Sequence, residues 1–297
     1  MVLILVIISF LLIVLIILLM KKEIHNEEEF QMDPKDIQYL KESREWFITL
    51  VGGFSGGFSN RVRTMVAYKL LSDYLHKKVS FIWKNDVYCQ CNFKDIFNTE
   101  LVKEYKVYDQ CPKGKKDIPC NVDSIHSLST KFTKDETVIN KLKNKEGEYW
   151  LKLFIPNRSI IEKSRHFISM NFKGDFNAVH IRMKNEFVEN TKGSTGGKTQ
   201  NYKEFEDFIE KSKLPVFCTT DTLAKRKELE KKFGTKVKFY GDNWDENSYR
   251  ASTVEDAICC ILICIQADNF KGTFYSSFSG LISTLRRLKK SNVQSKN

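Results

Sequence analysis

Short apolar segments alternate with amphipathic ones along most of the chain. The apolar runs at residues 46–51 and 79–83 are bounded by glycine or polar residues and predict buried parallel strands. Between them, apolar residues recur at helical spacing over residues 62–74, which predicts a helix. Residues 85–150 show no comparable periodicity and are interpreted as an irregular, cysteine-containing insertion.

A second alternating series begins at Ile160. Strands that alternate with helices form parallel sheets covered on both faces. The two series therefore predict an α/β protein with two Rossmann-like halves, whose ligands bind at the carboxyl ends of the strands. In the second series, strands are predicted at 177–182, 216–219, 236–240 and 270–274, and helices at 160–170, 223–233 and 254–265.

The amino-terminal residues 2–20 form an almost unbroken apolar run, interrupted only by Ser9. At a helical rise of 1.5 Å per residue the run spans about 30 Å, the thickness of a bilayer's hydrocarbon core, so it predicts one transmembrane helix. A cleaved signal peptide is the alternative, but its apolar segment is normally shorter. The predicted organisation is an anchor at 1–20, a stem at 21–45, a first domain at 46–158 and a second at 159–297.

Two signals on membrane topology disagree. Lys21 and Lys22 follow the anchor, which by the positive-inside tendency keeps the rest of the chain cytosolic. A cysteine-rich stretch instead favours disulfide bonds in an oxidising lumen. We expect a single-pass membrane protein of the Golgi or endoplasmic reticulum with a lumenal domain, a cytosolic-facing domain being the alternative. The cysteines of this stretch are Cys89, Cys91, Cys111 and Cys120, whose spacing does not fit a zinc site.

Composition and charge narrow the possible partners. With 42% hydrophobic and 29% charged residues, the chain has the composition of a folded globular protein. Its formal net charge of +11 attracts anionic ligands such as a nucleotide diphosphate. Because no run of five basic residues occurs, nucleic acid is not predicted as a partner.

Several polar or glycine-rich segments follow predicted strands. The loop at 52–60 contains four glycines, which let the backbone approach a ligand closely, although a structural turn explains them equally well. His180 and Arg182 share one face of a strand, and the guanidinium suits a diphosphate; a satisfied histidine and a surface arginine are the alternative. Asp221 suits either a helix cap or a ribose contact. Ser276 begins a helix, where it suits either an anion or an ordinary N-cap.

The order of these segments resembles the GDP-fucose-dependent fucosyltransferases, especially the protein O-fucosyltransferases. The resemblance covers about residues 46–288, and its most specific block is Gln-Ala-Asp-Asn-Phe-Lys-Gly at 266–272 followed by Ser-Ser-Phe at 276–278. The other matching pieces are Gly57-Phe58-Ser59-Asn60, His180-Ile181-Arg182 and Thr220-Asp221.

The resemblance implies a GT-B fold, in which the second Rossmann-like domain holds most of the nucleotide sugar donor. It implies transfer of fucose from GDP-fucose to a hydroxyl of a protein or glycan acceptor, with inversion and without a metal or other cofactor. The alternatives are a catalytically silent, membrane-anchored protein that binds a sugar nucleotide or glycan, and a transferase for another nucleotide sugar.

The resemblance also assigns residues. It implies that Arg182 and Asn60 are catalytic, with Asn60 beside the transferred sugar and Arg182 on the diphosphate. Ser59 and Arg61 depart from the family pattern, which often has glycine and glutamine there, and they leave the acceptor open. The residues expected to bind the substrate are Gly56, Gly57, Phe58, Asn60, Arg61, His180, Arg182, Asp221, Ser276, Ser277 and Phe278.

Overall fold

The computed structural model describes most of the chain from residue 32 onward, including the second part of the predicted stem. In the described residues no helix is both long and apolar enough to cross a membrane. The predicted anchor at 2–20 and the start of the glycine loop, including Gly56, lie outside them. The described ranges are 32–50, 57–101, 105–120, 124–183, 201–242, 244–245, 252–274 and 276–294.

The first half of the described chain forms a parallel sheet with the strand order β3-β2-β1-β4. The apolar runs predicted as strands form its centre, and the long helix α3 (Phe58–Tyr74) connects them as expected. Helix α2 (Pro34–Glu42) precedes the sheet and is capped by Asp33, whose carboxylate accepts from the Lys35 amide. The strands are β1 (Glu45–Leu50), β2 (Lys78–Trp83), β3 (Lys106–Tyr108) and β4 (Asp117–Cys120).

The interpretation of residues 85–150 as an irregular insertion is wrong. This segment supplies both outer strands of the first sheet and three helices. The two strands are only three and four residues long, too short to show an alternating pattern. Pro119 lies within β4, which is tolerated because β4 is an edge strand. The helices are α4 (Phe93–Ile96), α5 (Ile125–Phe132) and α6 (Glu136–Leu153).

The second half repeats this plan with the strand order β7-β6-β5-β8, again all parallel. The two parallel sheets predicted from the sequence are therefore confirmed. The strands are β5 (Asn177–Ile181), β6 (Val216–Thr220), β7 (Val237–Lys238) and β8 (Phe270–Gly272). The helices are α7 (Arg158–Asn171), α9 (Lys203–Lys211), α10 (Leu223–Phe233), the 3-10 turn η1 (Gly234–Lys236), α11 (Val254–Gln266) and α12 (Ser277–Gln294).

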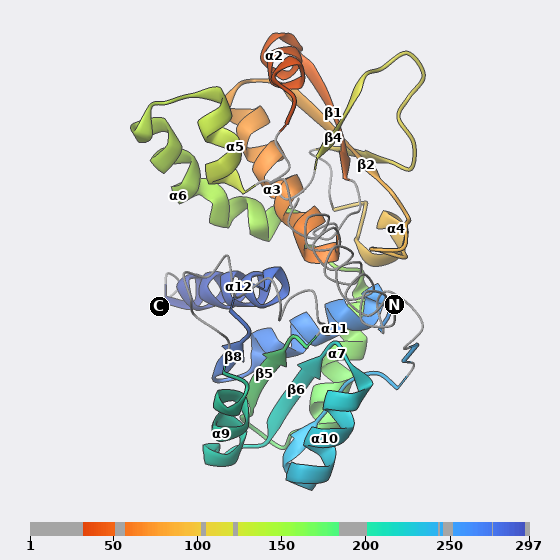
Figure 1. Ribbon diagram of the computed structural model, residues 1–297, viewed down its shortest axis with the longest axis vertical. Helices are drawn as coiled ribbons and strands as arrows, with labels where there is room; N and C mark the ends of the chain where they lie inside the picture. The colour runs from red at the N-terminus through yellow and green to blue at the C-terminus, as the bar shows by residue number, and fades with distance from the viewer. Residues whose placement is uncertain are drawn as a thin grey trace, which may run out of the picture.

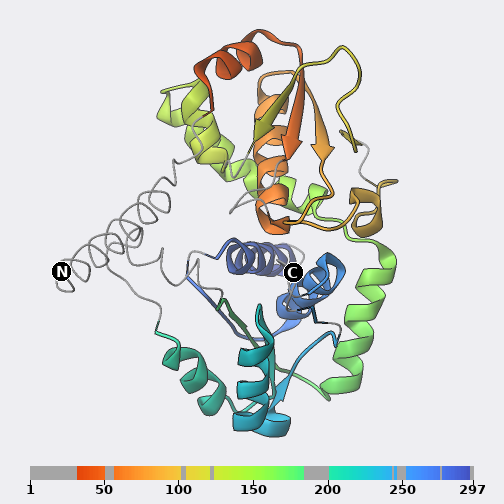
Figure 2. The same cartoon turned by 45° about the vertical axis from the view of Figure 1, so that its right-hand side comes forward.

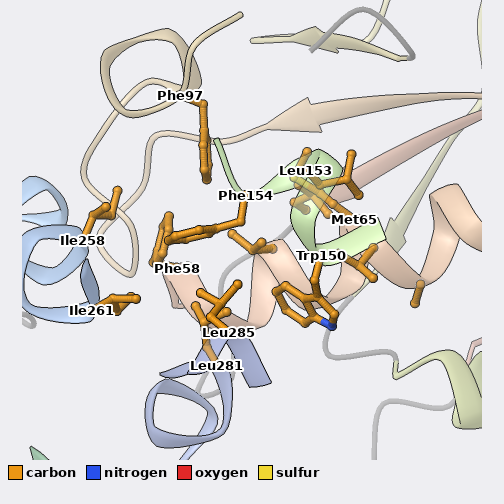
Figure 3. Packing of buried hydrophobic residues seen from close by; sticks show 14 of the residues in the cluster. Phe58, Met65, Phe97, Trp150, Leu153, Phe154, Ile258, Ile261, Leu281 and Leu285 are labelled. Atoms are coloured by element: carbon orange, nitrogen blue, oxygen red, sulfur yellow. The ribbon is translucent and has the colours of Figure 1, made fainter. Parts of the chain in front are cut away.

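Helix α12 follows the last strand and lies between the two sheets (Figures 1 and 2). It packs against α11 of its own half and against α3 and α6 of the other. Leu281 and Leu285 of α12 meet Phe58 of α3 and Trp150 of α6 in one continuous apolar core, which Figure 3 shows from close by. Burial of this surface holds the two halves together.

The buried side chain of Arg286 ties α12 to the end of α11. Its guanidinium donates to the carbonyl oxygens of Cys264 at 2.7 Å, Ala267 at 2.5 Å and Asp268 at 2.8 Å. The Cys264 carbonyl belongs to the last turn of α11, where a helix leaves its carbonyls unsatisfied, and Ala267 and Asp268 directly follow the helix. A cation there also complements the helix dipole, so the middle of α12 is held against the end of α11.

All eight cysteines lie in the described part of the chain, and all are free thiols. The prediction that the cysteine-rich stretch is joined by disulfide bonds is therefore not borne out. The Cys120 thiol lies 2.9 Å from the Tyr68 hydroxyl, and the sulfurs of Cys89 and Cys91 lie 3.7 Å apart. Burial raises the pKa of the Cys260 thiol to about 12, as expected for a cysteine that serves as a small core residue.

Candidate functional site

Most of the predicted site residues meet where β5, β6 and β8 end and α12 begins. Parallel strands end at one edge of their sheet, and this edge faces α12 and the first half (Figure 1). The distant segments around 182, 221 and 273–279 are thereby brought together. This edge is the candidate functional site.

Arg182 lies one residue past β5 and forms an ion pair with Asp221, one residue past β6. The Arg182 Nε atom is 3.1 Å from Asp221 Oδ2, and these side chains are 18% and 14% exposed. The other carboxylate oxygen accepts from the Met183 amide at 2.7 Å. Thr222, not Asp221, caps α10. The helix-cap alternative for Asp221 is thus excluded, and its carboxylate instead orients the arginine at the sheet edge.

His180 is a buried support of the site. Its Nδ1 atom shares a hydrogen bond of 2.7 Å with Ser279 Oγ, and its ring lies 4.6 Å from the ring of Phe278. Burial, with a smaller contribution from Arg182, lowers the pKa of His180 to about 3, so the imidazole is neutral at physiological pH. His180 therefore holds the start of α12, and its direct contact with a substrate stays a prediction.

Thr273 and Ser279 complete this support, and the sequence did not single them out. The Thr273 hydroxyl donates to the His180 carbonyl at 2.9 Å and accepts from the Arg182 amide at 2.9 Å. The Thr273 amide donates to Ser279 Oγ at 3.0 Å. Both residues flank the Ser-Ser-Phe motif, but nothing in their sequence distinguishes them from other buried hydroxyls. Together they fix β5, β8 and α12 at one point.

Ser276 directly precedes α12, and Ser277 and Phe278 begin its first turn. Ser276 is buried, its carbonyl accepts from the Gly280 amide at 2.9 Å, and its hydroxyl lies 3.5 Å from the Ser279 amide. It therefore acts as the N-cap. Capping and anion binding are compatible here, because a helix start has several amides and a positive dipole end.

Gly272 of β8 is required by the close approach of α12. A Cβ atom at this position would lie 2.7 Å from the Ser279 Cβ and 2.8 Å from its Oγ. We expect Gly272→Ala to lower the free energy of unfolding by about 1 to 3 kcal/mol through overpacking, and to weaken anion binding at α12. Chemical denaturation measures the first effect. Gly174→Ala, where an added Cβ meets no atom within 4 Å, is the control and should change little.

The glycine-loop residues in the described part have mainly structural roles. Gly57 precedes α3 in extended conformation, with φ −67° and ψ 167°. Phe58 is buried, and its ring stacks on that of Phe97 at 5.9 Å. Asn60 is half-buried, and its Oδ1 accepts from Arg63 Nη2 at 2.5 Å. Of these predicted substrate-binding residues, Phe58 belongs to the core.

Arg61 also points into the protein. Its guanidinium donates to both carboxylate oxygens of Asp86, at 2.7 and 2.6 Å, and to the carbonyl of Lys84. The guanidinium carbon lies 5.3 Å above the Trp83 ring, and the side chain is only 1% exposed. The prediction that Arg61 binds the substrate is corrected: the structure uses it to hold the loop after β2.

A cavity of about 520 Å³ lies between the halves. Ser276 and Ser277 line it from the second half, whereas Arg182 and Asp221 lie outside its lining. The first half contributes Ser59, Arg63, Glu146 and Trp150, of which sequence reasoning identified none as a site residue. In the part of the chain that the structure describes, no group of three histidine, cysteine, aspartate or glutamate side chains could hold a metal ion.

No family model matches the sequence, and no curated protein sequence does either. Solved structures do match. POFUT1 in complex with GDP aligns with a TM-score of 0.51 and 13% identity, over 82% of this chain and 95% of that one. POFUT1 with GDP-fucose gives a TM-score of 0.50 and 15% identity, over 82% and 93%. The α-1,6-fucosyltransferase NodZ soaked with GDP-fucose aligns with a TM-score of 0.50 and 11% identity, over 81% of this chain and 92% of that one. The chain therefore has the fold of these proteins, as the resemblance implied.

Proposed function

We propose that this chain is a glycosyltransferase that moves fucose from GDP-fucose to a hydroxyl of a protein or glycan acceptor. The observation that carries the proposal is the placement of Arg182, held by Asp221, at the sheet edge where α12 begins. Solved structures of the same fold contain GDP or GDP-fucose, which supports this donor. We further propose inversion at the sugar and no metal.

The chemistry follows from where charge develops. Breaking the bond between the sugar and the phosphate leaves negative charge on GDP. The Arg182 guanidinium and the amides at the start of α12 can stabilise that charge without reorganising, because Asp221, Thr273 and His180 already hold them. Asn60 is proposed to lie beside the transferred sugar, presented from the first half by its bond to Arg63.

The placement in the cell is part of the same proposal. Residues 2–20 are proposed to anchor the chain in the Golgi or endoplasmic reticulum, with the two sheets in the lumen. The free thiols give no support to a lumenal over a cytosolic domain.

Thermal unfolding with GDP, UDP or CMP tests the donor. A ligand that binds only the native state at 100 times its Kd adds about 2.7 kcal/mol of stability, or about 4 to 5 °C in Tm for a chain of this size. We expect this rise with GDP and not with UDP or CMP. A rise with UDP or CMP alone would assign another nucleotide sugar, and no rise with any of them would contradict the proposed function. Release of fucose from GDP-fucose by the full chain then tests for turnover.

A further inference from the structure

The cavity between the halves carries two charged side chains in its lining, Arg63 of α3 and Glu146 of α6. Apart from Leu281, the rest of the lining is made of small, hydroxyl-bearing or aromatic residues. Along α12 the cavity extends from Ser276 to Thr284. At 1.5 Å per residue these eight steps cover about 12 Å, which accommodates a phosphate, a sugar ring and an incoming hydroxyl in line.

Glu146 belongs to the end of the cavity that is remote from Ser276. Its neighbour Gly147 meets Leu288 of α12, since a Cβ on Gly147 would lie 2.7 Å from the Leu288 Cδ2 atom. Leu288 is three turns further along α12 than Ser277, the first helical residue. The Glu146 carboxylate of the first half and the first turn of α12 in the second half therefore lie at different ends of the same cavity.

The carboxylate of Glu146 is oriented, and no cation of the described residues forms a direct ion pair with it. Trp150 Nε1 donates to its Oε1 atom at 3.2 Å, and the side chain is half-buried. The nearest positive group of the lining is Arg63, whose Nε atom is buried without a hydrogen-bond partner. Burial lowers the pKa of Arg63, and the charge of Glu146 opposes that shift. Arg63 also holds Asn60, so these three first-half residues form one polar group.

An inverting transfer requires the attacking hydroxyl to approach opposite the departing phosphate, and a base must take its proton. We propose that Glu146 is this general base, which rests on the proposed function. The carboxylate takes the proton of the acceptor hydroxyl, and the hydroxyl oxygen forms a bond to the anomeric carbon. The bond from that carbon to the β-phosphate oxygen breaks, and its electron pair leaves on GDP at the start of α12.

The experiment compares Glu146→Gln with Glu148→Gln, an exposed glutamate on the same helix. Water serves as the acceptor in a GDP-fucose hydrolysis assay, so the natural acceptor need not be known. We expect Glu146→Gln to lower kcat by about 10²- to 10⁴-fold, the usual contribution of a general base, with an unchanged Kd for GDP and an unchanged Tm. Glu148→Gln should behave as the wild type.

Adding azide to the assay distinguishes a general base at Glu146 from a residue that only supports the structure. Azide is an anion that attacks the anomeric carbon without losing a proton, so it needs no base. With Glu146→Ala, added sodium azide should restore release of GDP from GDP-fucose and yield a fucosyl azide.

Undiminished hydrolysis by Glu146→Gln, or a loss that azide does not restore in Glu146→Ala, overturns the assignment while leaving GDP binding and the proposed function in place. A wild-type chain that binds no GDP overturns both.

Discussion

Arg182→Ala is expected to lower the turnover of GDP-fucose by about 10²- to 10³-fold, the loss typical of removing one preorganised group that stabilises a developing anion. The physical reason is its position: the guanidinium lies at the edge where β5 and β6 end, and Asp221 holds it 3.1 Å away in an ion pair. A lysine cannot reproduce a fork that contacts both the aspartate and a phosphate, so Arg182→Lys should also be impaired. Steady-state release of fucose measures the effect.

The control for Arg182 is Arg165→Ala, because Arg165 is exposed on α7. It should leave turnover and Tm unchanged. Asp221→Asn should cost less than Arg182→Ala, since it removes only the orientation of the guanidinium. Wild-type turnover by Arg182→Ala would remove the observation on which the proposed function stands.

Arg61→Ala is expected to lower the free energy of unfolding by about 3 to 5 kcal/mol, because it leaves the Asp86 carboxylate without its partner in a mostly buried ion pair. The lost contact with Trp83 and the Lys84 carbonyl adds to the effect. Denaturation in urea measures it. In contrast, the joint replacement Arg61→Met with Asp86→Leu should recover most of the loss, since no charge then remains buried.

The same pair of variants separates a structural from a substrate-binding Arg61. If the joint replacement restores both stability and affinity for GDP, Arg61 holds the loop only, as the structure indicates. If stability is restored and the affinity for GDP is still lost, the original prediction of a substrate contact was right and the structural assignment is wrong.

Most of the second half could be predicted from the sequence, whereas the outer parts of the first could not. Helix α11 has a long, regular apolar pattern, and the strand containing His180 has a short apolar core between polar segments. Strands β3 and β4 have three and four residues, and their place is set by pairing with β2 and β1 rather than by their own pattern. Non-local pairing overrides weak local preference.

The candidate site shows the same division. Arg182 and Asp221 were predicted because Arg182 ends one recognisable strand pattern and Asp221 closely follows another. The burial of Arg61 had a signal that went unused: it lies three residues after Phe58 and four before Met65, on the apolar face of α3. No sequence pattern marked Glu146 as a site residue, because it lies in a lysine-rich helix. Its place beside the cavity depends on packing against α12, more than a hundred residues later in the chain.

The packing of α12 has a consequence for the synthesis of the chain. Leu281 and Leu285 of α12 cover part of the apolar surface of α3 and α6, and they are synthesised more than a hundred residues after α6. The amino-terminal half therefore emerges from the ribosome with exposed apolar surface. Nascent chains in this state aggregate or bind chaperones. Premature termination before Ser277 would deprive both halves of their common partner, so shortened products should be degraded rather than persist as a folded first half.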